Sequence, residues 1–192
     1  MKIKDVFEEV IYGYNMANAK IDDSCVKDVF VLQKDSIEYT NIIPSKLIKR
    51  RISIDVKKKY YMSDRDIVIY LKKPYKVGTY RFNRDLEVVI PNSFIILKGI
   101  NMDLYSFIFV TNYLEKIGID NYILEHNING NLTKEDIEQI ELPNISKEEQ
   151  MKISNLINNI NERSSIYSII LANDDQIIRY ALKEVIGDNN DK

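Results

Sequence analysis

The sequence predicts an α+β fold in which a mixed, curved β-sheet is followed by one long C-terminal helix. Short runs rich in Ile, Val, Tyr and Phe recur between residues 27 and 98, and they are separated by turn residues such as Pro74, Asn83 and Pro91. After Pro143, by contrast, a proline-free run with helical apolar spacing continues to Ile186. These two observations predict the fold class and place the boundary between its parts at Pro143.

The N-terminal part is expected to hold strands with helices before and after them. Residues 3–12 have the spacing of a short opening helix. The predicted strands are 27–33, 47–55, 66–72, 77–82, 86–90 and 93–98. Residues 102–116 have helical spacing, with Gly118 as the stop. Residues 133–136 open a short helical or turn segment ahead of a strand-like run, 137–142.

The C-terminal run carries both a start and a stop signal for a helix. Pro143 moves Leu142 out of the helical region, and the Ser146 hydroxyl can accept a hydrogen bond from the N–H of Glu149. Gly187 and the polar residues after it provide the stop. The helix is therefore expected to begin near Ser146 and to extend about forty residues, roughly 60 Å at 1.5 Å per residue.

Apolar residues recur on one face of this helix at steps of three and four residues. They are Ile153, Leu156, Ile157, Ile160, Tyr167, Ile170, Leu171, Ile178, Ala181, Leu182 and Val185. A helix that overhangs a small domain must bury such a stripe against another helix, most simply that of a second copy or of a partner. The alternative is a helical hairpin broken near residues 173–175, because the polar Asp174 falls on the stripe.

Composition narrows the class of protein. With 192 residues, 45% of them hydrophobic and 29% charged, the chain is typical of a soluble globular domain with an appendage. The N-terminus lacks the apolar core of a signal peptide and no segment has the length of a membrane helix, so a cytoplasmic protein is expected. Cys25 is the only cysteine and His126 the only histidine, which excludes intrachain disulfides, Cys-rich zinc sites and multi-histidine metal sites.

The net charge of −2 conceals a strongly basic segment. Residues 46–84 hold thirteen Lys or Arg and three Asp, a net charge of +10, so the remainder carries −12. The cations fall in four runs that are interleaved with aromatic residues. Lysine and arginine neutralise phosphates, and each contact releases counterions. Four runs in so short a segment favour DNA or RNA binding over the alternative of a solvated charged face.

The candidate nucleic-acid contacts all lie in this basic segment. They are Lys49, Arg50, Arg51, Lys57, Lys58, Lys59, Lys72, Lys73, Lys76, Arg81 and Arg84, expected to contact mostly phosphate, with Tyr60, Tyr75 and Asn83 as candidates for base contact.

Catalytic motifs are missing from the sequence. There is no Gly-rich phosphate loop, Gly-x-Ser-x-Gly elbow, His-Glu-x-x-His or Asn/Asp-Pro-Pro-aromatic tetrapeptide. The pairs Asp64/Asp66 and Asp120/Glu125 could bind a divalent ion for nuclease work, but a lone carboxylate pair in a turn is ordinarily solvated surface. A non-catalytic chain without a metal site is therefore expected.

The junction ahead of the long helix, residues 137–150 (IEQIELPNISKEEQ) followed by Lys152-Ile153, resembles that of specificity subunits of type I restriction–modification enzymes. In that family a proline-containing strand end leads through Glu-Glu-Gln-x-x-Ile into a long spacer helix. Residues 62–69 (MSDRDIVI) are similar to the family's Gly-Asp-Ile-Val strand, with Arg65 in place of the usual glycine. Residues 129–132 (NGNL) are similar to its glycine turn, and the family's diproline is reduced to Pro143-Asn144.

The resemblance implies one DNA target recognition domain, residues 1–145, one dimerisation and spacer helix, 146–187, and a disordered tail, 188–192. Family members typically contain two recognition domains and two spacer helices. A half-length specificity subunit is therefore expected to dimerise through an antiparallel helix pair and to read a palindromic, bipartite site in double-stranded DNA.

The resemblance also implies partners that carry the chemistry. A separate methyltransferase subunit is expected to hold S-adenosylmethionine and to grip the spacer helices, a translocating restriction subunit can join, and no cofactor is expected on this chain. The alternative is an antirestriction or regulatory protein that binds the methyltransferase without directing methylation.

Overall fold

The computed structural model describes residues 1–18, 26–53, 56–80 and 86–187. The chain divides into two compact units, Met1–Gln150 and Met151–Lys192. The first unit is a mixture of strands and helices, and the second is the greater part of one helix, α4 (Lys147–Gly187). The predicted fold class, a mixed, curved sheet followed by one long helix, is confirmed. The predicted tail, 188–192, lies outside the described residues.

The strands of the described residues form two mixed sheets. The larger contains, in spatial order, β1 (Phe7–Tyr12), β9 (Phe94–Ile100), β6 (Ile67–Tyr70), β7 (Lys76–Thr79), β4 (Asn41–Ile42) and β3 (Ile37–Glu38). The smaller contains β5 (Ile48–Ser53), β2 (Val26–Val31) and β8 (Val88–Val89). β4 runs parallel to β7 and β8 parallel to β2, whereas the remaining pairs are antiparallel.

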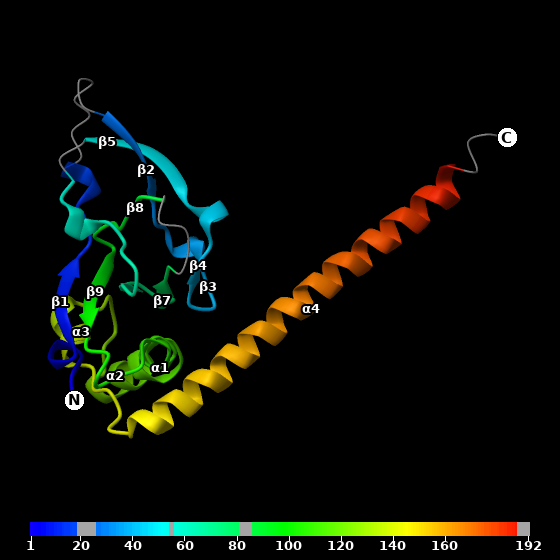
Figure 1. The fold of residues 1–192 in the computed structure, drawn as a ribbon. Helices are drawn as coiled ribbons and strands as arrows, with labels where there is room; N and C mark the ends of the chain where they lie inside the picture. Colours follow the sequence, from blue (N-terminus) through cyan, green and yellow to red (C-terminus); the bar gives the residue numbers. More distant parts are fainter. Residues whose placement is uncertain (19–25, 54–55, 81–85, 188–192) are drawn as a thin grey trace. The chain divides into compact units, whose positions relative to one another are not determined.

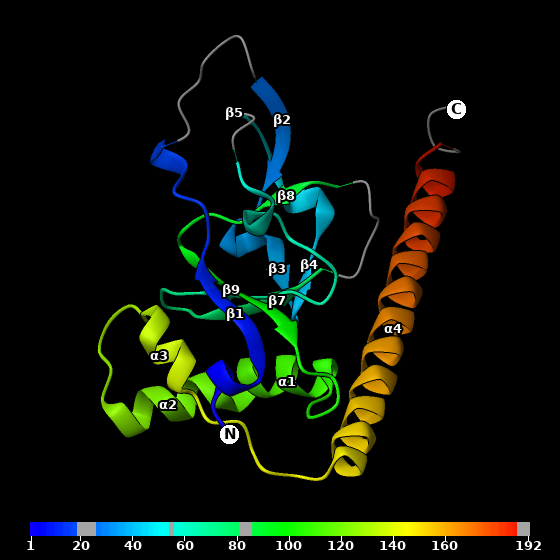
Figure 2. The same cartoon turned by 60° about the vertical axis from the view of Figure 1, so that its left-hand side comes forward.

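The helices of the first unit gather at one end of the larger sheet. Figures 1 and 2 show α1 (Phe107–Tyr113), α2 (Ile119–His126) and α3 (Lys134–Gln139) at this end, and the three-stranded sheet at the other. Along the central strands, Ile67, Ile69 and Leu97 contribute to the cluster that includes helical residues, while Val68 and Ile96 contribute to a second cluster. All five side chains are fully buried. The alternation of a strand therefore builds a core on both faces of the sheet.

Residues 3–12 do not form the predicted helix. Only Ile3–Asp5 is a 3-10 turn, and Phe7–Tyr12 is strand β1, paired antiparallel with β9 from Phe7↔Ile100 to Tyr12↔Ile95. The buried apolar residues of this segment have helical spacing, which is why the sequence predicts a helix. The free edge of β9 overrides that preference, because tertiary pairing outweighs weak local propensity.

Residues 102–116 are helical only from Phe107, and Gly118 is not the stop. α1 passes through a π-helical segment, Leu114–Gly118, into α2, which ends at Asn127 in the left-handed conformation (φ 52°). A Cβ at Gly118 would lie 2.7 Å from Cε1 of Tyr113. This glycine therefore makes room for an aromatic ring inside a continuous helix.

The strand predicted for 137–142 is also wrong. The chain forms α3 there, begun by a capping box in which Thr133 Oγ1 accepts from the Asp136 N–H and the Asp136 carboxylate accepts from the Thr133 N–H. Only Glu141 is strand-like, in an isolated bridge with Lys2. The helical start predicted at 133–136 is confirmed.

The missed elements are β3 and β4, a two-residue hairpin. Its turn residues, Tyr39 and Thr40, both have positive φ (45° and 66°). Such turns are normally recognised by Gly, Asn or Asp, so the sequence carries no turn signal here. The other predicted strands correspond to β2, β5, β6, β7, β8 and β9, with bounds that differ by a few residues.

Helix α4 begins as predicted. The Glu149 N–H donates to Ser146 Oγ (3.2 Å), and the Ser146 N–H donates to the Glu149 carboxylate (3.0 Å). The helix then continues without interruption to Gly187, so the alternative break at 173–175 is wrong. Asp175 instead accepts a hydrogen bond from Arg179 one turn later (2.7 Å), which supports the helix at that point.

Gln150 shows why the junction motif ends in glutamine. Its side chain is 1% exposed, and its Oε1 accepts from the Ser106 N–H at 2.8 Å. Its Nε2 donates to the carbonyls of Leu104 (3.1 Å) and Ile145 (3.2 Å). One buried amide therefore satisfies backbone groups of two loops, a role that a carboxylate or an aliphatic side chain could not take over.

Candidate nucleic-acid interface

Strand β5 presents its cations on both of its faces. Lys49 Nζ lies 2.9 Å and Arg51 Nε 3.6 Å from the carboxylate of Asp28 on β2. The hydrogen bond from Lys49, with a smaller contribution from Arg51, holds the pKa of Asp28 below its usual value. Arg50 is exposed on the opposite face, across from Val29 in the β2–β5 register. Asp28 therefore offsets one charge on one face, and Arg50 is left to act on the other.

The lysine run 57–59 lies at the same end of the unit as β5. All three lysines are exposed, and the turn Lys58–Tyr60 is hydrogen-bonded to the chain around β8, from the Ile90 N–H to the Tyr60 carbonyl (3.0 Å). Since β8 is next to β2 and β2 next to β5, the two basic runs share the end formed by the three-stranded sheet. The structure thus brings together six of the predicted contacts.

Tyr60 is packed as well as polar. Its ring centroid lies 5.4 Å from that of Tyr14, and Lys59 Nζ lies 5.1 Å from the Tyr60 centroid. The residue is half-buried. Its ring is therefore already in use on the protein's own surface, with a lysine over it.

The run 72–76 lies elsewhere, at the turn between β6 and β7. Lys72 and Lys73 are exposed, and the Lys73–Pro74 peptide is cis. The Tyr75 hydroxyl donates to the Gly130 carbonyl (2.5 Å), and Lys76 Nζ donates to the Ile37 carbonyl (2.7 Å). Tyr75 is thus tied to the helical end of the unit, away from the end that holds β5.

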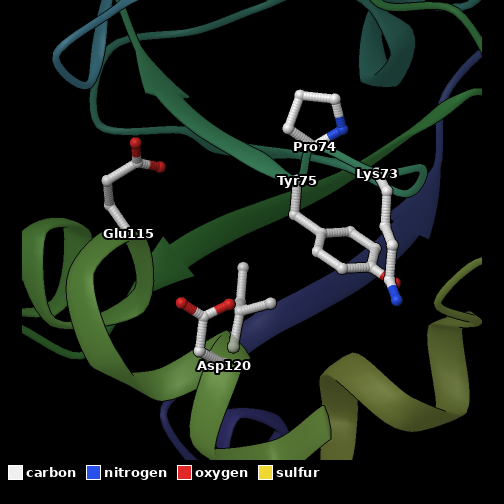
Figure 3. Close-up of a pocket in the computed structure, with 6 residues that line it drawn as sticks. Lys73, Pro74, Tyr75, Glu115 and Asp120 are labelled. Atoms are coloured by element: carbon white, nitrogen blue, oxygen red, sulfur yellow. The ribbon is translucent and has the colours of Figure 1, made fainter. Parts of the chain in front are cut away.

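A cavity of about 480 Å³ separates this turn from the helices. Figure 3 shows Lys73 and Tyr75 on its strand side and Glu115 and Asp120 on its helical side. Burial raises the pKa of Glu115, opposed by the hydrogen bond that the Val77 N–H donates to its carboxylate (2.8 Å). Glu115 therefore ties the π-helical segment to β7.

The predicted Arg81, Asn83 and Arg84 lie outside the described residues. Of the carboxylate pairs weighed as metal ligands, Asp66 is buried and bonded to Lys98 Nζ (2.5 Å) and to the Ser63 N–H (2.8 Å). Burial raises the pKa of Asp66, and the bond from Lys98 opposes this. Its partner Asp64 is exposed. A structural ion pair accounts for Asp66.

Two whole-chain features were also searched within the described residues. No group of three or more His, Cys, Asp or Glu side chains there is placed to hold a metal ion. None of the helices described has the combined length and apolar character needed to cross a bilayer.

One aromatic residue was missed by the sequence analysis. Tyr39 is 83% exposed, the highest value among the exposed large apolar side chains of the described residues. It stands at the β3–β4 turn, and Lys46 and Lys76 are bonded to the same hairpin, at Glu38 and at the Ile37 carbonyl. The Thr40 carbonyl accepts from the Thr79 N–H (2.8 Å), which fixes the turn.

No protein-family model matches the sequence, and no curated protein matches it. Two solved structures share its fold. One is the HsdS subunit from Thermoanaerobacter tengcongensis, with a TM-score of 0.56 and 16% identity over 86% of this chain and 37% of that one. The other is a chain from a study of complex assembly and conformational transition of the type I restriction–modification system, with a TM-score of 0.56 and 15% identity over 86% of this chain and 38% of that one.

The resemblance expected from the junction is thus confirmed at the level of the fold. The matched share, 86%, is more than the first unit alone contains. The chain spans less than two fifths of the length of the proteins that it matches.

Proposed function

We propose that this chain is the half-length specificity subunit of a type I restriction–modification system, a non-catalytic reader of double-stranded DNA. The observation that carries the proposal is the shared fold with HsdS over 86% of the chain, combined with the span of less than two fifths of its length. The Glu-Glu-Gln junction supports it, because each residue after Ser146 has a structural role that this fold needs.

DNA contact is assigned to the basic segment. Arg50 and Lys57, Lys58 and Lys59 are exposed cations at one end of the first unit, and no ion pair for them is found among the described residues. They are the strongest candidates for phosphate contact. Lys49, Arg51, Lys72, Lys73 and Lys76, and the sequence candidates Arg81, Asn83 and Arg84, complete the set. Tyr39 joins Tyr60 and Tyr75 as a candidate for base contact, because its ring is exposed on a fixed turn.

The long helix is assigned to dimerisation. Ile153, Leu156, Ile160, Tyr167, Ile170, Leu171, Ile178, Leu182 and Val185 are exposed in the single chain, and Ile157 is half-buried. Such a row of large apolar side chains needs a partner in solution. A second copy, antiparallel to the first, supplies a matching row, and its two-fold symmetry makes the two halves of the DNA site an inverted repeat.

A second apolar row on the same helix supports a second partner. Ile166, Ile169, Ile177 and Tyr180 are exposed and lie off the first row. In a helix pair this second row remains open to a further subunit. We assign it to the methyltransferase subunit, which holds S-adenosylmethionine and transfers the methyl group, and a restriction subunit then joins that complex. All of these steps place the chain in the cytoplasm, where the DNA is.

Co-expression with the cognate methyltransferase subunit, followed by methylome sequencing, tests the proposal. The expected result is a modified motif made of two inverted half-sites with a fixed gap, absent when the methyltransferase subunit is expressed alone. If the chain co-purifies with the methyltransferase but no motif is modified, the proposal is wrong and the antirestriction or regulatory alternative holds.

A further inference from the structure

A heptad seam runs along α4. It consists of Ile153, Ile157, Ile160, Ser164, Tyr167, Leu171, Asp174, Ile178, Ala181 and Val185, at alternating steps of four and three residues. This alternation is the pattern by which two helices pack along one side. Only Ser164 and Asp174 interrupt it with polar side chains, and both are exposed in the single chain.

The two interruptions are placed symmetrically. Ser164 is the fourth seam position from one end, and Asp174 is the fourth from the other. In an antiparallel pair whose two-fold axis passes beside Ile169, each residue faces the one equally far on the other side of that point. The layers are then Ile153 with Val185, Ile157 with Ala181, Ile160 with Ile178, Tyr167 with Leu171, and Ser164 with Asp174.

We propose that a second copy of this chain docks on α4 in this one register, fixed by a hydrogen bond from the Ser164 hydroxyl to the Asp174 carboxylate of the other copy. The inference rests on the dimerisation proposed above and names its geometry. Every apolar seam residue then meets an apolar residue, and both polar layers are satisfied.

Other arrangements bury Asp174 against an unsuitable neighbour. A shift by one heptad in either direction places its carboxylate opposite Leu171 or opposite Ile157. A parallel pair in register places the two Asp174 carboxylates together. A carboxylate that loses water without a donor, or that faces a like charge, is strongly disfavoured. A single polar seam position is known to specify register for this reason.

Disulfide trapping in the full chain tests the register. In a Cys25→Ser background, variants Ser164→Cys and Asp174→Cys are mixed, allowed to exchange subunits and oxidised. Cross-linking is expected between the two variants and not within either one. In the proposed register two copies of residue 164 are ten residues apart along the helix axis, about 15 Å at 1.5 Å per residue, which exceeds the reach of a disulfide.

Control mixtures report the competing arrangements. Ser164→Cys with Tyr167→Cys, and Leu171→Cys with Asp174→Cys, cross-link only in the two shifted registers, and Ser164→Cys alone only in a parallel pair. A sedimentation measurement accompanies each mixture. A dimer that cross-links only in a control mixture overturns the register and leaves dimerisation standing, whereas a wild-type chain that sediments as a monomer overturns both.

Discussion

At the scale of single residues, two glycines give a matched test of the first unit's packing. A Cβ at Gly13 would lie 2.2 Å from the Pro91 carbonyl oxygen and 2.5 Å from that of Ile90, whereas a Cβ at Gly130 would meet nothing within 4 Å. Because the Gly13 clash is with backbone, we expect Gly13→Ala to lower the free energy of unfolding by about 3 kcal/mol. Gly130→Ala should change it by less than about 0.5 kcal/mol. Urea unfolding of both variants measures the difference, and equal stabilities would contradict the close approach of these two segments.

Tyr39 allows base contact to be tested without disturbing the fold. Asparagine tolerates the positive φ of this turn better than tyrosine, so Tyr39→Asn should fold at least as stably as the wild type. We expect it to bind a duplex selected by the wild type from a randomised pool about ten-fold more weakly, the effect of losing one aromatic contact to a base. Tyr39→Phe, which keeps the ring, should bind normally. An undiminished affinity of Tyr39→Asn in fluorescence anisotropy would remove Tyr39 from the interface.

Arg65 accounts for the departure from the resembled strand motif. It has φ 65°, a left-handed conformation that glycine adopts without steric cost. The backbone of this turn is therefore what the family's glycine serves, and in this chain arginine adopts the same conformation at a cost of about 1 kcal/mol. The turn is fixed by the Ser63 N–H, which donates to Asp66 at 2.8 Å.

At the scale of elements, Asp174 determines how α4 pairs. Asp174→Leu places a leucine on the seam, so we expect a tighter dimer, because a buried carboxylate is replaced by an apolar contact. We also expect its cross-links to spread over several registers, because the polar layer is lost. Asp175→Leu removes the same charge one position off the seam, together with the surface bond to Arg179, and should leave dimer affinity nearly unchanged. Sedimentation equilibrium compares the three chains, and a weaker Asp174→Leu dimer would refute the seam.

The sequence predicts those elements whose signals are local. The capping box at Ser146 and the uninterrupted run behind it are enough for α4, and alternating β-branched residues are enough for β6 and β9. β1 could not be predicted, because its apolar spacing suits a helix and only β9, more than eighty residues away, decides otherwise. The β3–β4 hairpin escaped because its left-handed turn uses tyrosine and threonine.

The candidate interface was predicted in composition and not in arrangement. The cations of 46–84 were identified from sequence, but the pairing of Lys49 with Asp28 depends on a strand register that no local pattern reveals. For the same reason the sequence could not separate the run at 72–76, tied to Gly130 through Tyr75, from the run at 57–59.

At the scale of the whole molecule, the salt dependence of DNA binding tests the electrostatic assignment. Arg50→Glu combined with Lys58→Glu removes two exposed cations from one end of the first unit. We expect weaker duplex binding and a slope of log K against log salt that is smaller by about two, since each lost phosphate contact removes roughly 0.9. Lys4→Glu combined with Lys116→Glu changes the net charge equally outside the basic segment. The assignment fails if both double variants lose the same affinity.

The positions of Ser164 and Asp174 also bear on which chains can mix. The two-fold axis repeats their layer, so each substitution at either position is felt twice in one dimer. A related chain in the same cell whose polar seam positions fall elsewhere would have to bury a carboxylate or a hydroxyl against leucine or isoleucine to form a hybrid. The seam thus insulates the dimer from its relatives, and two such proteins with different DNA targets can coexist without exchanging halves.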